Sequence, residues 1–255
     1  MKDKFILTPF FLDQPLPGLE GLTGEDWAVN QTTTGEGNIQ EHMGVLYQPL
    51  AEFVFNAVSE GERPVSIAGD CCTSIGVFAG LRRANIYPDL IWFDAHGDFN
   101  TWETTPSGFL GGMPLAMLVG RGEQTILEAI GLNPINETKV ILTDARDLDP
   151  GERESLEESQ VVHMTNVEEL LNYPLGARDL YIHFDTDIVD PSEAPGMNYP
   201  APGGPSVNTL QRVFQHLAHT SRIVAVSLSS WIPSLDPDGR SQTAAMSLLH
   251  ALLEG

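Results

Sequence analysis

Cysteine is nearly absent from the 255-residue sequence, which contains only the adjacent pair Cys71 and Cys72. Two neighbouring cysteines have poor geometry for a structural disulfide, so this usage fits a reducing compartment. The sequence also lacks a run of the roughly 18 apolar residues that a membrane-spanning helix needs. Its first residues do not resemble a secretory signal with a small-residue cleavage site. From these absences we expect a cytoplasmic protein with no membrane partner.

Basic residues are also scarce: 13 lysines and arginines stand against 35 aspartates and glutamates, which gives a formal net charge of -22. A field of this sign repels nucleic acid and anionic membrane surfaces and attracts cationic ligands. Simple solubility would explain the same charge. The charge therefore argues against a nucleic-acid partner but does not identify a ligand.

Apolar, β-rich segments alternate with longer amphipathic segments along the whole chain. Strands are predicted at 5–8, 64–68, 90–94, 139–143, 161–164, 180–185 and 223–228. Helices are predicted at 48–59, 73–84, 113–119, 123–130, 150–157, 167–172, 207–220 and 241–253. Continuously apolar strands that alternate with helices indicate an α/β fold with a mainly parallel central sheet covered on both faces. No repeat or linker divides the chain, so we expect a single domain over residues 1–255, with loops at 16–24 and 195–205.

Acidic residues follow several of the predicted strands directly. They are Asp70, then Asp94 and Asp98 with His96 between them, then Asp147 and Asp149, and finally Asp185 and Asp187. The carboxyl ends of parallel strands meet at one edge of a sheet, where α/β proteins bind their ligands. We therefore expect these side chains to gather in one site.

Two segments of this set carry the strongest metal-binding signal. The run Asp94-Ala-His96-Gly-Asp98 can turn alternate side chains toward one point, and Asp185 and Asp187 have the same spacing. Carboxylates with one imidazole suit Mn²⁺ or a similar ion. Acids at strand ends also form turns and cap helices, which is the alternative for either segment alone. Together, on neighbouring strands, they favour a two-metal site.

Five segments resemble, in the same order and at similar spacing, the arginase/agmatinase (ureohydrolase) superfamily. They are IAGDC at 67–71, WFDAHGDFN at 92–100, SGFLGGMP at 107–114, ARDLDPGE at 145–152 and HFDTDIVDP at 183–191. The resemblance implies a three-layer α/β/α fold. It also implies a centre of two Mn²⁺ ions per chain, at which a hydroxide bridging the metals hydrolyses a guanidinium group to urea and an amine.

The resemblance also assigns roles to individual residues. Asp94 and Asp185 match the carboxylates that bridge the two metals. Asp98 matches a ligand of one metal that also positions the hydroxide, which makes it the catalytic residue, and His96 and Asp187 match ligands of the other metal. The substrate-binding positions of arginases are matched by Asn100, Ser107, Asp149 and Glu152. For Asp149, which precedes Pro150, a helix cap is the alternative.

The sequence departs from the family pattern at three positions. Cys71 replaces a metal-binding histidine, and a thiolate ligand there would shift the preference toward Zn²⁺ or Fe²⁺. Gly111 replaces a histidine that shuttles protons, and a glycine is expected to open the mouth of the pocket. Ser230 replaces the glutamate that pairs with the guanidinium, a charge that Asp236 or Asp238 could supply instead.

These features together predict an atypical arginase-like amidinohydrolase. The expected partner is a small guanidino substrate such as arginine, or an arginine-containing peptide converted to ornithine and urea, and we expect a homo-oligomer. An Nω-hydroxyarginine hydrolase is one alternative. The other is a non-catalytic binding or regulatory protein on the same scaffold, which the three departures motivate. Against it, a cluster of carboxylates without metal would repel one another and cost stability.

Overall fold

The computed structural model describes residues 1–229 and 231–254, and its centre is an eight-stranded sheet in the order β4-β1-β5-β10-β9-β6-β7-β8. Every strand pair of this sheet is parallel. Its strands are β1 (Asp3–Thr8), β4 (Ala28–Val29), β5 (Arg63–Ala68), β6 (Asp89–His96), β7 (Val140–Asp147), β8 (Val162–Met164), β9 (Asp179–Asp185) and β10 (Arg222–Ser229). A separate hairpin pairs β2 (Phe10–Phe11) with β3 (Gln14–Pro15).

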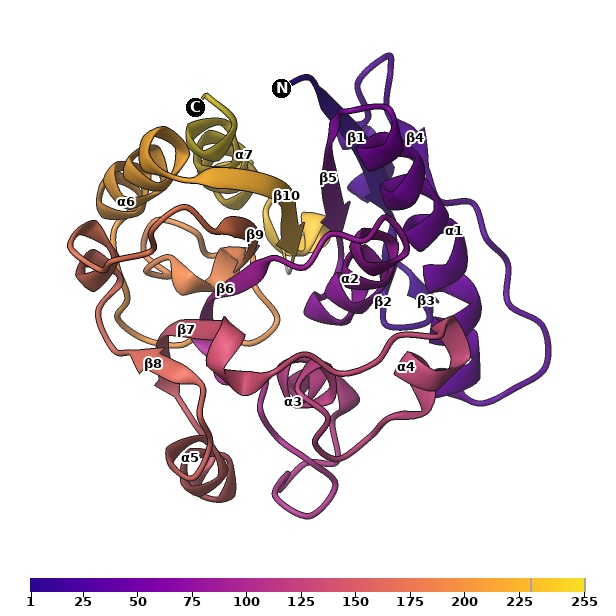
Figure 1. Cartoon of the computed structure of the whole chain (residues 1–255), viewed down its shortest axis with the longest axis horizontal. Helices are drawn as coiled ribbons and strands as arrows, with labels where there is room; N and C mark the ends of the chain where they lie inside the picture. The colour runs from indigo at the N-terminus through magenta and orange to yellow at the C-terminus, as the bar shows by residue number, and fades with distance from the viewer. Residues whose placement is uncertain (230, 255) are drawn as a thin grey trace.

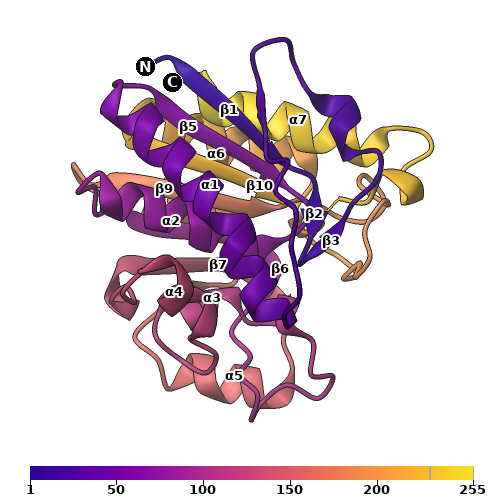
Figure 2. The ribbon, with the colours of Figure 1, turned by 90° about the vertical axis from the view of Figure 1, so that its right-hand side faces the viewer.

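Helices cover both faces of the sheet, so the predicted three-layer α/β/α fold is confirmed (Figure 1). The helices are α1 (Ile39–Ser59), α2 (Ser74–Arg83), α3 (Pro114–Leu118), α4 (Thr125–Ile130), α5 (Pro150–Glu157), α6 (Val207–Thr220) and α7 (Arg240–Leu253). Helices α1 to α4 pack on one face, toward the viewer in Figure 2, and α6 and α7 pack on the other. No helix in the described part of the chain is long and apolar enough to span a membrane.

Alternate side chains of the central strands serve the two faces. Trp92 and Tyr181 belong to the core beneath α1 and α2, whereas Phe93 and Phe184 belong to the core beneath α6. The rings of Phe93 and Phe184 both contact Phe214 of α6, with centroids 4.8 and 5.2 Å away. Burial on both faces explains why these strands read as continuous apolar runs.

The predicted strands are all present, but two details were wrong. Helix α1 begins at Ile39 rather than at residue 48, because Asn38 and Glu41 form a capping box ahead of it. Gly44 and Pro49 inside this helix weakened its sequence signal. The segment predicted as a helix at 167–172 is a 3-10 helix, η5 (Val167–Leu171).

The order of the strands determines where a ligand can bind. Strands β5 and β6 follow each other in the sequence, yet β10 and β9 lie between them in the sheet. Such a reversal of strand order leaves a crevice at the carboxyl ends of the strands. The short 3-10 helices η2 (Cys71–Thr73) and η6 (Thr186–Ile188) begin at this edge.

Candidate metal centre

Five of the six predicted ligands of the metal centre come from the ends of two adjacent strands, and the sixth, Cys71, follows β5. Strand β6 ends at His96, and β9 ends at Asp185 just before η6. Both segments are tightened by their own acids: Asp94 Oδ1 accepts a hydrogen bond from the His96 amide at 2.7 Å, and Asp185 Oδ1 accepts one from the Asp187 amide at 2.9 Å. These turns aim the carboxylates of both segments into one cluster.

Asp94 lies between two groups of ligand atoms. Its Oδ1 is 3.5 Å from His96 Nδ1, which in turn lies 2.9 Å from Asp187 Oδ2. Its Oδ2 is 3.7 Å from Cys71 Sγ, which lies 2.8 Å from Asp185 Oδ2. The carboxylate of Asp94 therefore faces a nitrogen-containing group on one side and a sulfur-containing group on the other.

Burial makes the negative charge of this cluster costly. Burial, together with the charge of Asp185, raises the pKa of Asp94 above its ordinary value. Burial, together with the charge of Asp94, raises the pKa of Asp98 well above its ordinary value. Burial also raises the pKa of Asp187 to about 6. Although burial opposes it, hydrogen bonds to Asp187 and Asp94 raise the pKa of His96 to about 12. The cluster thus requires protons or cations to balance its charge.

These residues fit a pair of divalent cations. Two groups, Asp94 with His96 and Asp187, and Asp94 with Cys71 and His183, each place their ligand atoms within 4.8 Å of one another. Because Asp94 belongs to both, the groups are adjacent, as a binuclear centre requires. Asp98 Oδ2 is buried and has no hydrogen-bond partner among the described residues. An orphaned carboxylate oxygen next to such groups is what a cation would satisfy.

A cavity of about 360 Å³ opens above this cluster. All ten side chains predicted for the site line it: Cys71, Asp94, His96, Asp98, Asn100, Ser107, Asp149, Glu152, Asp185 and Asp187. The volume is at the small end of the range for pockets that bind small molecules. The structure therefore brings the predicted metal-binding and substrate-binding residues together.

The predicted substrate-binding residues also hold one another. Glu152 accepts hydrogen bonds from the amides of Phe99 and Asp149 at 2.8 and 3.2 Å, and Asn100 donates one to Asp149 Oδ2 at 3.0 Å. Asp149 and Glu152 form a capping box on α5, so the helix cap considered from the sequence is present. Burial raises the pKa of Glu152 to about 7. Asp149 and Glu152 therefore cap α5 and line the cavity at the same time.

Three aromatic side chains at the mouth of the cavity escaped the sequence analysis. Phe109 lies between Phe11 and Tyr199, with ring centroids 6.2 and 5.2 Å away. A Cβ atom at Gly111 would overlap the ring of Phe109. The expectation that the glycine opens the mouth was therefore wrong, because the Phe109 ring fills the vacated space. No local motif links these three residues, which come from distant segments.

The charge missing at Ser230 is not supplied where the sequence suggested. Ser230 itself lies outside the described residues. Asp236 accepts hydrogen bonds from the amides of Ser241 and Gln242 at the start of α7, and neither it nor Asp238 lines the described cavity. Both candidates were wrong, because the Asp236 carboxylate already binds the amides at the start of α7 and the Asp238 side chain is exposed.

Another lining residue, Asp70, has a structural role. Its carboxylate accepts hydrogen bonds from the amides of Leu12 and Cys72, both at 2.8 Å. Asp70 therefore ties the β2–β3 hairpin, which carries Phe11, to the segment that carries Cys71. Burial raises its pKa to about 6.

Comparison with known proteins identifies relatives over most of the chain. A family model described as the arginase family matches residues 17–254. The arginase of Bacillus subtilis strain 168 is 33% identical over 218 residues, which cover 81% of this chain and 74% of that protein. The arginase of Bacillus caldovelox is 33% identical over 218 residues, covering 80% and 73%.

Solved structures agree with the sequence comparison. The crystal structure of Bacillus caldovelox arginase superposes with a TM-score of 0.85 at 26% identity, covering 100% of this chain and 98% of that one. Bacillus subtilis arginase gives a TM-score of 0.84 at 28% identity, covering 100% and 99%. The likeness therefore includes the whole three-layer architecture.

Proposed function

The chain belongs to the arginase family of ureohydrolases, and we propose that it hydrolyses the guanidinium group of arginine or a close arginine derivative. The products are urea, or a substituted urea, and the corresponding amine. The observation that carries this proposal is the pair of ligand groups sharing Asp94 at the base of a cavity lined by acids.

In this proposal two Mn²⁺ ions bind at the base of the cavity. His96 and Asp187 would hold one ion, Asp98 and Cys71 would hold the other, and Asp94 and Asp185 would serve both. When bound, the two ions would lower the pKa of a water molecule between them and offset the charge of the four aspartates. The geometry that supports this arrangement is the position of Asp94 between the nitrogen and sulfur groups.

Asp98 is the residue best placed to handle the proton of the attacking water. Its Oδ2 atom is buried and lacks a partner among the described residues. Its backbone φ of 50° is left-handed, a conformation that a non-glycine residue keeps only when its surroundings hold it. Asp98 would orient water toward the guanidinium carbon, accept its proton, and return that proton to the leaving nitrogen as the C–N bond breaks.

The walls of the cavity suit a small cationic amino acid. Asp147, Asp149 and Glu152 line one side, and Asn100 and Ser107 add neutral polar groups. The acids would attract the ammonium group of the substrate, and the amide and hydroxyl groups would hydrogen-bond to its carboxylate. Because the cavity is small, about 360 Å³, and three aromatic side chains line it, we favour free arginine or Nω-hydroxyarginine over an arginine side chain within a peptide.

The test is urea release, with added Mn²⁺, from arginine, agmatine, Nω-hydroxyarginine and an arginine-containing peptide. We expect arginine or its hydroxylated form to react, and Asp98→Asn to lower kcat by roughly 10²-fold or more. Asp238→Asn, which removes an exposed acid, serves as the control and should retain full activity.

Two outcomes of this panel would change the conclusion. If the peptide reacts and free arginine does not, the chain modifies peptides. If no guanidino compound reacts although metal is bound, the non-catalytic binding protein becomes the better account. Homo-oligomerisation and a cytoplasmic location stay predictions from the sequence.

A further inference from the structure

His183 is a buried imidazole in β9 that belongs to the second ligand group, but it has been given no role in the proposed function. Its side chain is 0% exposed, and its ring lies against the Trp92 indole with centroids 3.9 Å apart. Trp92 and His183 are direct partners in the β6–β9 register. Because side chains two residues apart share one face of a strand, His183 lies beneath Asp185 on the floor of the metal centre.

The two nitrogens of the His183 ring have different surroundings. Nδ1 lies 2.7 Å from Ser227 Oγ, which is itself 2.7 Å from the hydroxyl of Tyr181. Nε2 is buried and has no hydrogen-bond partner among the described residues. A buried polar atom of this kind costs free energy, so its retention calls for a ligand.

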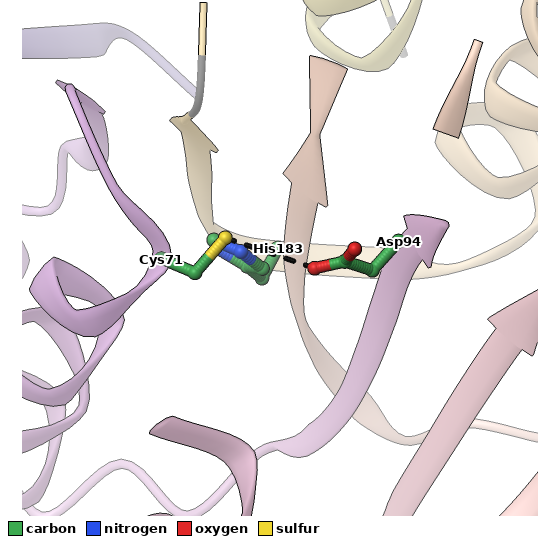
Figure 3. A group of neighbouring side chains, drawn as sticks. All are labelled: Cys71, Asp94 and His183. Carbon is green, nitrogen blue, oxygen red and sulfur yellow. Dashed lines mark hydrogen bonds between the residues drawn. The ribbon is translucent and has the colours of Figure 1, made fainter. Parts of the chain in front are cut away.

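That ligand position is defined by Cys71 and Asp94. A nitrogen of His183, the sulfur of Cys71 and a carboxylate oxygen of Asp94 lie within 4.8 Å of one another. Figure 3 shows the three side chains meeting from three separate segments, η2, β6 and β9. The Asp94 oxygen on this side, Oδ2, also accepts a hydrogen bond from Trp92 Nε1 at 3.1 Å, which fixes its orientation.

We propose that His183 Nε2 is a metal ligand, and that it supplies from β9 the imidazole that Cys71 does not supply from η2. The donor set of this second site would be the Cys71 thiolate, the His183 imidazole and the carboxylates of Asp94, Asp98 and Asp185. The proposal rests on the binuclear centre of the proposed function. It deepens that proposal by giving the sulfur side a higher affinity for a borderline-soft ion, Zn²⁺ or Fe²⁺, than for Mn²⁺, which still fills the site when added in excess.

The hydrogen bonds behind the ring support this role. With the ring proton on Nδ1, His183 donates to Ser227 Oγ, and the lone pair of Nε2 points to the site. Histidines that bind metals are commonly oriented by a hydrogen bond from the other ring nitrogen. Ser227 and Tyr181 would thus fix the tautomer and the angle of the ring.

Metal counting and X-ray absorption test the assignment. The zinc-loaded protein should hold about two ions per chain, and His183→Phe, which keeps a ring against Trp92, should hold about one. His163→Phe, which replaces a half-buried histidine that does not line the described cavity, is the control and should keep both ions. Extended X-ray absorption of the unaltered zinc protein should show one sulfur and two imidazoles shared between the two ions, which needs no variant to fold.

Each result decides the matter. The proposal is overturned if His183→Phe retains both ions with an affinity within roughly tenfold of the parent, or if the spectrum shows a single imidazole. Fewer than two ions on the unaltered protein would overturn both this assignment and the binuclear centre. If metal binding follows His183 as described while no guanidino compound releases urea, the proposed reaction fails and the ligand assignment stands.

Discussion

Cys71 Sγ lies 2.8 Å from Oδ2 of Asp185, so a thiol and a carboxylate face each other at the base of the cavity. Burial, together with the charge of Asp185, raises the pKa of the Cys71 thiol well above its ordinary value. Without metal the proton therefore stays on the sulfur. A divalent cation would replace that proton and bind the thiolate and the carboxylate together.

This relationship predicts a spectroscopic signature for Cys71. Protein loaded with Co²⁺ should show a near-ultraviolet charge-transfer band from thiolate to metal, and Cys71→Ser should abolish it. Cys71→His should abolish the band as well, but it should raise the affinity for Mn²⁺ relative to Zn²⁺, since imidazole is a harder donor than thiolate. A band that persists in Cys71→Ser would show that the sulfur does not bind metal.

The contact between Phe109 and Gly111 predicts a coupled pair of substitutions. Gly111→Ala should displace the half-buried Phe109 ring, because the new methyl group would overlap it, and should destabilise the protein by about 1 kcal/mol. Adding Phe109→Ala should remove most of that penalty, which urea denaturation of the four proteins in the cycle would measure. Additive effects of the two substitutions would contradict the claim that the ring occupies this space.

The contacts of Arg146 predict that it supports the metal centre through the backbone of Asp187. Its guanidinium donates to the carbonyls of Asp187, Ile188 and Ala201 at 3.0 to 3.1 Å and forms an ion pair with Asp144. Arg146→Lys cannot reproduce this planar set of hydrogen bonds, so it should lower the unfolding free energy by about 2 kcal/mol and weaken Mn²⁺ binding. Denaturant unfolding and a Mn²⁺ titration measure the two effects. Arg153→Lys on the exposed side of α5 is the matched control and should change neither.

The pKa shifts predict how pH acts on the metal-free protein. Burial raises the pKa of Asp187 to about 6 and that of Glu152 to about 7, from ordinary values of 3.8 and 4.5. Their protonated forms favour the folded state at acid pH, and this contribution is lost as pH rises toward 6 and 7. Burial lowers the pKa of His183 from 6.5 to about 3. Its neutral form therefore adds stability as pH rises from about 3 to about 6.5, and its contribution no longer changes above that pH.

The net result is measurable by thermal melting with EDTA and with Mn²⁺. From about pH 6 to about pH 8 the midpoint of the EDTA-treated protein should fall, and the increase caused by Mn²⁺ should grow, because metal binds the deprotonated ligands. Glu152→Gln should flatten the fall. A midpoint that rises with pH in EDTA would mean that these carboxyl groups are not buried as described.

The sequence predicted the strands and the gathering of the aspartates in one site because both signals are local. Continuous apolar runs mark buried parallel strands, and the ligands stand within a few residues of two strand ends. The position of His183 beside Cys71 and Asp94 was missed because an isolated histidine in a strand is usually a core residue. Only the pairing of β9 with β6 shows that its ring faces Cys71 and Asp94.

The mouth of the cavity was missed for a related reason. The stacking of Phe11 on Phe109 joins the β2–β3 hairpin to a loop nearly a hundred residues away. The sequence shows that Gly111 stands where the family pattern has a histidine, but it does not show that the Phe109 ring occupies the space of that side chain. Tertiary packing alone determines that.

The most direct test of the account is a titration of the metal-stripped protein with Mn²⁺, with metal per chain and urea release from arginine measured on the same samples. We predict little urea until occupancy passes about one ion per chain and full activity near two, because in the proposed function both ions would be needed to activate the attacking water. Full activity at one ion, or no urea with two ions bound, would contradict the binuclear hydrolase proposed for this chain.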